Sequence, residues 1–141
     1  MKTNNLILKT LATVISSCIF LLSLSLYFGG HFFPGGGFVG GLLCTMALAL
    51  AMFTHGIDEV ERILPINYIY IIATGLLCAI GTAFHGVLTG ENFFKHHFTH
   101  AHLPLIGEVE LHTAAIFDLG VYLIVVGVLM SVILAFGKDG K

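Results

Sequence analysis

The sequence GGHFFPGGGFVGG, from Gly29 to Gly41, lies between two long hydrophobic runs and contains seven of the chain's 17 glycines and one of its three prolines. Glycine and proline both disfavour the interior of a helix. Hydrocarbon offers a bare backbone no hydrogen-bond partner, so such a segment is tolerated only at the membrane edge or where protein or a water-filled cavity surrounds it. We therefore expect this stretch to mark a junction between two membrane-spanning segments.

The whole chain has the composition of an integral membrane protein. Of its 141 residues, 57% are hydrophobic and 10% are charged, and the mean hydropathy is +0.98. Soluble domains carry about 25% charged residues. The net charge of -2 provides no basic surface for nucleic acid, which excludes that class of partner. We expect a single all-α membrane domain over residues 1–141, in contact with the lipid bilayer.

Four apolar segments account for this composition, and we expect transmembrane helices at about residues 6–28, 38–54, 66–88 and 113–136. A helix needs about 20 apolar residues to cross a hydrocarbon core of roughly 30 Å. The first segment is too long for the apolar part of a signal peptide, and no A-x-A cleavage site follows it. The second segment is short, so either its helix begins late inside protein or the glycine stretch enters the membrane as a non-helical lead.

The basic residues predict the orientation of these four helices. One side of the membrane would carry five of them, whereas the other side would carry only Lys95; the five are Lys2, Lys9, Arg62, Lys138 and Lys141. Positive residues concentrate on the cytoplasmic side. We therefore expect both termini in the cytoplasm, with the glycine stretch and the connector after residue 88 on the outer face.

Small residues recur at spacings that suit close helix contact. In the second segment Gly36 and Gly40, like Gly37 and Gly41, are four residues apart, which lets another helix approach closely. The third segment carries a stripe of small and polar residues at helical spacing, which we expect to face protein: Gly75, Cys78, Thr82 and His85. His85 either hydrogen-bonds across a helix interface or exchanges protons near neutral pH.

Asp118 is the only carboxylate inside any of the four predicted spans. A charge near the centre of a membrane costs on the order of 3 kcal/mol on insertion scales, so it usually faces a partner or a wet cavity. The alternative is that Asp118 stands in the first turn of a helix that starts late, where the dipole of that helix stabilises it. Both interpretations remain open at this point.

The two polar connectors are expected to be solvated loops. The first, from His55 to Pro65, reads HGIDEVERILP. The second, from Thr89 to Leu111, is rich in histidine, and its His96 and His100 have a spacing that could bind zinc on one helical face. No cysteine or carboxylate stands at a matching distance, so we favour a pH-sensitive loop over a metal site.

Nothing in the sequence indicates an enzyme, a cofactor or a metal centre. No serine or cysteine nucleophile has a plausible base, and the GxGxxG pattern in the glycine stretch lacks the preceding strand of a dinucleotide site. The three cysteines are widely spaced inside apolar runs and are expected to stay reduced; they are Cys18, Cys44 and Cys78.

Two motifs carry a family resemblance. GGHFFPGGGFVGGLL, which begins at Gly29, and IFDLGVYLIVVG, from Ile116 to Gly127, resemble the MnhB component of the Mrp-type multisubunit sodium/proton antiporter of bacteria. The resemblance covers nearly the whole chain in the same order. Its motif positions fall on Gly29, His31, Pro34, Gly35, Gly36, Gly37, Phe38, Gly41, Phe117, Asp118, Gly120, Val121 and Gly127.

The resemblance implies a subunit of a hetero-oligomer in the bacterial cell membrane, together with the other Mrp antiporter subunits. It implies exchange of cytoplasmic Na+ for external H+, driven by the proton motive force, in support of pH homeostasis and sodium resistance. The equivalent subunit of a membrane-bound hydrogenase or another complex-I-like respiratory complex is the alternative.

Two roles are open for this subunit within such an assembly. It either lines an ion path or packs against neighbours that carry the ions, and we slightly favour packing. The candidate residues for either role are His31, Pro34, Gly35, Gly36, Gly37, Phe38, His85 and Asp118.

Overall fold

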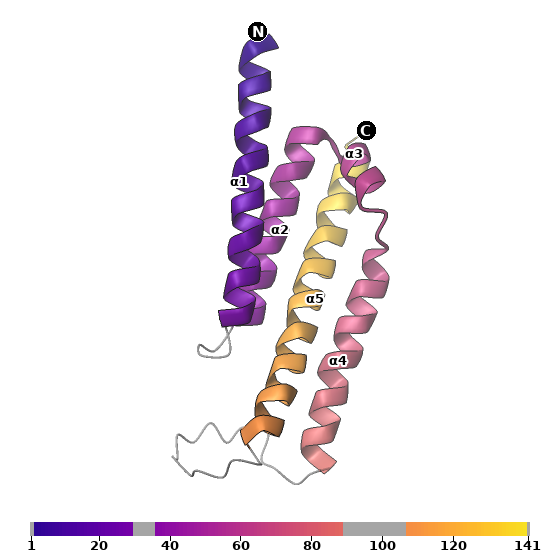
Figure 1. Ribbon diagram of the computed structural model, residues 1–141. Helices are drawn as coiled ribbons and strands as arrows, with labels where there is room; N and C mark the ends of the chain where they lie inside the picture. The colour runs from indigo at the N-terminus through magenta and orange to yellow at the C-terminus, as the bar shows by residue number, and fades with distance from the viewer. Residues whose placement is uncertain (1, 30–35, 89–106, 141) are drawn as a thin grey trace.

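The computed structural model describes residues 2–29, 36–88 and 107–140, and in these ranges every regular element is an α-helix. The helices are α1 (Lys2–Gly29), α2 (Gly36–His55), α3 (Ile57–Ile63), α4 (Tyr68–Leu88) and α5 (Gly107–Asp139), as Figure 1 shows. All except α3 are long and apolar enough to cross a membrane. The expected all-α fold with four transmembrane helices is confirmed.

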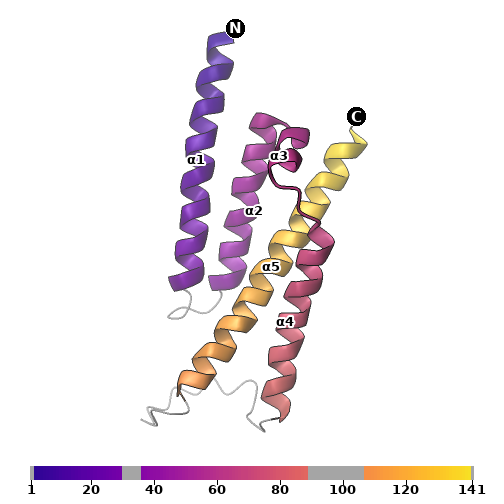
Figure 2. The ribbon, with the colours of Figure 1, turned by 45° about the vertical axis from the view of Figure 1, so that its right-hand side comes forward.

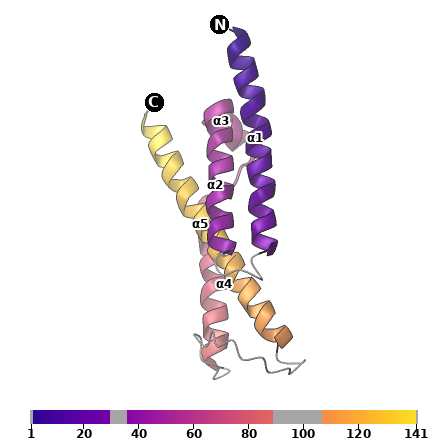
Figure 3. The same ribbon diagram turned by 90° about the vertical axis from the view of Figure 1, so that its left-hand side faces the viewer.

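The four long helices are arranged as two antiparallel pairs. α1 packs along α2, and α4 packs along α5, while the contact between α2 and α5 joins the pairs. The order across the molecule is therefore α1, α2, α5 and α4 (Figure 1). Figure 2 shows the two pairs side by side, and in Figure 3 α5 crosses behind α2 at an angle. This order differs from the order along the chain because α5 inserts between α2 and α4.

Burial follows from this order. In the most apolar stretch of α2, 39% of the residues are buried, against 11% in α1 and in α4. The buried core lies where α2, α3 and α5 meet, and it consists of Cys44, Met52, Val60, Val126, Met130 and Leu134. The outer faces of α1 and α4 therefore present apolar side chains that lipid or another protein must cover.

The second membrane helix begins earlier than expected. It starts at Gly36 rather than at Phe38, so Gly36 and Gly37 are helical residues. Gly37 is buried, which places the start of α2 inside protein. The helix therefore does not begin late, as the first of the two explanations required, although its start does lie inside protein; a non-helical lead would fall on residues 30–35, outside the described residues. The fourth span also differs from the expected range, because the apolar part of α5 covers His112–Asp139.

The connector after α2 was expected to be a solvated loop, and this expectation was wrong. It contains the short helix α3, which follows Gly56, a residue with φ of 92°. Val60 of α3 is buried in the core, and acidic residues occupy the first turn while Arg62 occupies the last. Such charges complement the helix dipole, and the buried apolar side chain docks the helix on its neighbours.

Both ends of the described chain lie at the same end of the molecule, together with α3 (Figure 1). An ion pair secures this end, because Lys138 Nζ of α5 lies 2.8 Å from Glu61 Oε1 of α3. We call this the terminal end. The opposite end, where α2 and α5 begin, is the loop end.

Candidate functional site

Asp118 of α5 lies against the first turn of α2. The backbone N–H of Gly37 donates a hydrogen bond to Asp118 Oδ1 over 2.9 Å. Gly37 is the second residue of α2, and the first four N–H groups of a helix have no acceptor within that helix. The positive end of the α2 dipole also favours a negative charge at this point. Asp118 therefore caps α2 from a different helix.

This geometry corrects one of the two interpretations of Asp118. The residue does not stand in the first turn of its own helix, because α5 begins at Gly107, about three turns before it. The stabilising helix terminus belongs to α2 instead. Asp118 is only partly buried, and its carboxylate faces a partner within the chain.

Gly37 must be a glycine for this contact to form. A Cβ atom at this position would overlap both the carboxyl group and the backbone carbonyl oxygen of Asp118. The requirement arises from close approach and not from backbone conformation, since Gly56 is the one described residue with a positive φ. The spacing of the two helices at the loop end is therefore set by the absence of a side chain at Gly37.

A buried hydrogen-bonded group ties three helices together about one turn further along α2. Ser23 of α1 is fully buried, and its Oγ donates to the carbonyl oxygen of Gly40 over 2.7 Å. The hydroxyl of Tyr122 of α5 lies 2.9 Å from Ser23 Oγ. Because a serine hydroxyl has one proton, Tyr122 donates and Ser23 accepts.

Gly40 and Gly41 let α1 and α5 approach α2 at this level. A Cβ at Gly40 would lie 3.1 Å from the carbonyl oxygen of Ser23 and 3.2 Å from the Tyr122 ring. A Cβ at Gly41 would lie 3.0 Å from Cβ of Val125. The close helix packing that the glycine spacing predicted is therefore observed on the α2 face that bears Gly37, Gly40 and Gly41.

The α4–α5 interface uses glycines in the same way. A Cβ at Gly75 would lie 2.7 Å from the carbonyl oxygen of Gly120, and a Cβ at Gly120 would lie 2.8 Å from the carbonyl oxygen of Gly75. Gly75 and Thr82 are buried, and Cys78 contacts the same surface. The small and polar stripe of the third span therefore faces α5 over these three residues.

The other described candidates lie at the start of α2 and at the end of α4. Gly36 opens α2, and the ring of Phe38 is 52% exposed on the outside of that helix. His85 lies in the last turn of α4 and its side chain is exposed. The structure therefore brings together Asp118 and the Gly37 backbone from the predicted set.

Several predicted positions lie outside the described residues. These are the candidates His31, Pro34 and Gly35 and the two histidines of the possible zinc site, His96 and His100. Within residues 2–29, 36–88 and 107–140, no group of three His, Cys, Asp or Glu side chains could hold a metal ion.

The sequence reasoning missed Ser23 and Tyr122. Neither is charged, and serine and tyrosine are common in apolar runs, so composition alone gives no signal. A heptad spacing was visible, however: Ser16 and Ser23 stand seven residues apart, and Ser16 Oγ also donates to a carbonyl oxygen of α2, that of Ala47, over 2.7 Å. A hydroxyl stripe at this spacing predicts one face of α1 against another helix.

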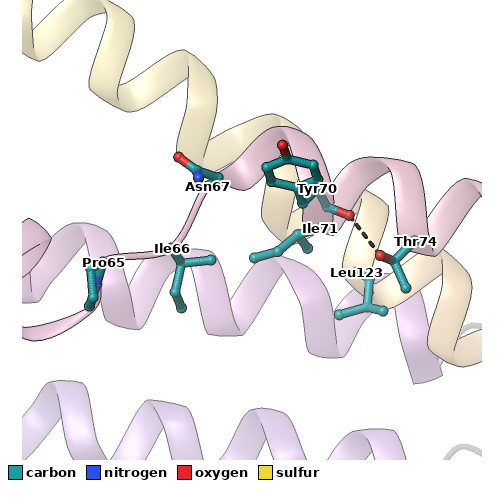
Figure 4. A pocket seen from close by; sticks show the side chains of 7 residues that line it. All are labelled: Pro65, Ile66, Asn67, Tyr70, Ile71, Thr74 and Leu123. Carbon is teal, nitrogen blue, oxygen red and sulfur yellow. Dashed lines mark hydrogen bonds between the residues drawn. The ribbon is translucent and has the colours of Figure 1, made fainter.

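A groove on the surface is a second feature of the molecule, but its lining offers no site for an ion. A shallow groove of about 400 Å³ lies beside the start of α4, and Figure 4 shows its lining residues: Pro65, Ile66, Asn67, Tyr70, Ile71, Thr74 and Leu123. None of the described residues that line it is charged. The Thr74 hydroxyl already donates to the carbonyl oxygen of Tyr70 over 2.7 Å (Figure 4). The groove suits an apolar contact better than an ion.

Comparison with known proteins gives consistent matches. Residues 7–131 match the family model described as a domain related to the MnhB subunit of Na+/H+ antiporter. The chain is 44% identical over 138 residues to the B-type subunit of the Na(+)/H(+) antiporter of Bacillus subtilis (strain 168), covering 98% of this chain and 96% of that protein. It is 40% identical over 139 residues to the antiporter subunit of the same name from Alkalihalophilus pseudofirmus, covering 99% and 96%.

Proposed function

The chain belongs to the family of MnhB-related Na+/H+ antiporter subunits, and from this premise we propose that it acts as one subunit of a multisubunit Na+/H+ antiporter in a bacterial cell membrane. The relatives carry the antiporter name over nearly the full length of both chains. A hydrogenase or complex-I-like assembly, the alternative that the sequence left open, is not favoured by these names.

We propose further that the assembly exchanges cytoplasmic Na+ for external H+ and uses the proton motive force. The other Mrp antiporter subunits would be the partners. Over the described residues, the other helices of this chain leave the outer apolar faces of α1 and α4 exposed, so these faces are available to partner subunits as well as to lipid. Such an exchange would support pH homeostasis and sodium resistance.

Within this assembly we propose that the subunit acts by packing and not by carrying ions. The observation that carries this proposal is the hydrogen bond from Gly37 to Asp118. A proton carrier must take up and release a proton, and protonation would remove the charge that stabilises the start of α2. Among the described residues, no buried side-chain nitrogen or oxygen lacks a hydrogen-bond partner. Ions moving past these buried side chains would therefore have to displace existing hydrogen bonds.

Membrane vesicles test the antiporter assignment. All neighbouring genes are expressed in a sodium-sensitive host with and without this chain, and sodium-dependent proton movement is measured. We expect exchange to vanish without this chain. Persistent exchange would contradict the assignment, and western blots of the remaining subunits distinguish a missing function from a missing assembly.

The proposed orientation places both termini in the cytoplasm. Among the described residues, Lys2, Lys9, Arg62 and Lys138 lie towards the terminal end or in α3 beside it, and by sequence Lys141 follows the fourth span while Lys95 falls in the connector between the third and fourth spans. A fluorescent protein fused after Lys141 should fluoresce, because it folds in the cytoplasm. An alkaline phosphatase fused at the same point should be inactive, and an active phosphatase would reverse the orientation.

A further inference from the structure

The groove beside the start of α4, which Figure 4 shows, follows the axis of that helix. Tyr70 and Ile71 stand four and three residues before Thr74, so the three share one face of α4. Asn67 directly precedes the helix and stands seven residues before Thr74, which makes the groove about 10 Å long. Because α4 and α5 are both long and apolar enough to cross a membrane, the groove runs in the direction of the lipid acyl chains.

The start of α4 is set back from the charged end of the molecule. A Cβ at Gly127 of α5 would lie 3.3 Å from the carbonyl oxygen of Tyr68, so α4 begins level with Gly127. Lys138, which pairs with Glu61, stands eleven residues further along α5, or about 16 Å. Charged side chains at helix ends extend into the headgroup layer. We therefore place the groove on the hydrocarbon side of that layer, with its Asn67 end nearer to the headgroups.

The groove has a polar edge and an aliphatic edge. In Figure 4 the amide of Asn67 and the hydroxyl of Tyr70 lie along one edge, whereas Ile66, Ile71 and Leu123 lie along the other. The described lining carries no charge. This division suits an amphipathic molecule whose bound part is uncharged.

The polar edge presents hydrogen-bond donors that the protein does not use. The backbone carbonyl oxygens there are engaged: that of Asn67 accepts from the N–H of Tyr70 over 3.0 Å, and that of Tyr70 accepts from the Thr74 hydroxyl over 2.7 Å. Within residues 2–29, 36–88 and 107–140, by contrast, the Asn67 amide and the Tyr70 hydroxyl bond to no other protein group, and both residues are exposed. A ligand at this edge must therefore supply acceptors.

We propose that this groove holds one membrane phospholipid, with an acyl chain along the aliphatic edge and a glycerol ester carbonyl that accepts a hydrogen bond from Asn67 or Tyr70. An ester carbonyl in a lipid is a free acceptor, whereas the backbone carbonyls inside a neighbouring protein helix are already bonded within that helix. Because the described lining carries no charge, the groove should not select among headgroups. The proposal is independent of the antiporter assignment.

Site-specific photo-crosslinking in the whole complex tests this proposal. p-Benzoylphenylalanine, which attacks C–H bonds under ultraviolet light, replaces Ile66 in cells grown with radioactive phosphate, and the complex is purified in detergent before irradiation. Lipid in the groove should give a radioactive adduct on this chain. Mass spectrometry should find phosphatidylethanolamine and phosphatidylglycerol in the adducts in proportion to their amounts in the membrane.

Leu77 provides the control position, because it is 74% exposed on α4 and does not line the groove. The same probe at Leu77 contacts bulk lipid. It should therefore give a radioactive adduct when whole membranes are irradiated, and this adduct should be lost when irradiation follows purification in detergent.

Two variants test the polar edge with the probe at position 66. Tyr70→Phe removes the free hydroxyl and should lower the amount of radioactive adduct about threefold, which is the effect of one hydrogen bond in a membrane. Thr74→Val is the matched control, because the Thr74 hydroxyl is already bonded to the carbonyl oxygen of Tyr70. Its adduct should stay at the wild-type level when the variants are compared at equal yield of assembled complex.

Three outcomes would overturn the proposal. A non-radioactive adduct that joins this chain to another subunit would mean that a protein covers the groove. Loss of the adduct at position 66 during purification, to the same extent as at Leu77, would mean transient contact with bulk lipid. Equal amounts of adduct in Tyr70→Phe and Thr74→Val would remove the assigned hydrogen bond.

Discussion

The N–H of Gly37 donates to Asp118 Oδ1 across 2.9 Å, so a carboxylate 81 residues further along the chain caps the start of α2. The two residues belong to the two separate motifs on which the family resemblance depends. In this contact the first motif leaves room because Gly37 has no side chain, and the second motif supplies the carboxylate that occupies this room.

Replacing Asp118 separates packing from ion transport. Asp118→Asn keeps an oxygen that Gly37 can bond but removes the charge, which at a helix terminus contributes about 0.3–1 kcal/mol and up to about 2 kcal/mol when partly buried. We expect a modest fall in the thermal stability of the complex, and exchange that falls in proportion to assembly. The measurement is sodium-dependent proton movement divided by the amount of assembled complex.

Asp118→Ala provides the comparison, since it removes both the charge and the acceptor. It should reduce assembly more than Asp118→Asn does. A different pattern would contradict the packing role: full assembly of Asp118→Asn with lost or pH-shifted exchange would make Asp118 part of an ion path.

Gly37→Ala should disrupt the loop end. The added methyl group would overlap the carboxyl group and backbone of Asp118, so α2 and α5 must separate or the hydrogen bond must break. Overpacking of this kind typically destabilises by about 1–3 kcal/mol. Complex recovered after detergent extraction, followed by size-exclusion chromatography, measures the effect.

Gly81→Ala is the matched control for Gly37→Ala. Gly81 also lies inside a membrane helix, but a Cβ there would meet nothing within 4 Å. Since alanine favours helix more than glycine does, this variant should assemble at least as well as wild type. If both variants assemble equally well, close packing at Gly37 is not needed.

The sequence was sufficient for the four membrane helices because each requires only a long apolar run. The sequence was also sufficient to identify the helix faces that carry glycines, because the spacing of glycines within one helix depends only on neighbouring residues. It did not predict α3, because the seven residues of α3 include Asp58, Glu59, Glu61 and Arg62, and one buried side chain, Val60, makes the helix dock. Burial of a single residue depends on tertiary contacts that the local pattern does not contain.

The partner of Asp118 was beyond the sequence for a similar reason. The position of Asp118 inside an apolar run indicated a carboxylate within a membrane span, but it did not indicate which helix would face that carboxylate. The answer depends on α5 inserting beside α2, which places two motifs far apart in the chain next to each other (Figure 1). Likewise, Ser23 and Tyr122 are paired by this arrangement alone.

Removing the Ser23 hydroxyl should destabilise the contact among α1, α2 and α5. Ser23→Ala leaves the hydroxyl of Tyr122 without its acceptor in a buried site. Interhelical hydrogen bonds in membrane proteins average about 0.6 kcal/mol. A double-mutant cycle with Tyr122→Phe should therefore give a coupling energy of about this size in the thermal or denaturant unfolding of the complex.

Ser17→Ala is the control for that cycle, because Ser17 is exposed and its hydroxyl bonds only to the carbonyl oxygen of Thr13 in its own helix. It should change stability by less than Ser23→Ala. Additive effects of Ser23→Ala and Tyr122→Phe would mean that the two hydroxyls do not stabilise each other.

The last prediction concerns α3, whose attachment depends on burial more than on charge. Val60→Asp places a carboxylate in the core beside α2 and α5, and an unpaired buried charge is strongly unfavourable. Glu61→Gln breaks only the exposed ion pair with Lys138, which high salt already screens. We expect Val60→Asp to make the α3 region accessible to protease in membrane vesicles at any salt concentration, whereas Glu61→Gln should match wild type. A larger effect of Glu61→Gln, abolished by salt, would instead make the ion pair the main attachment of α3.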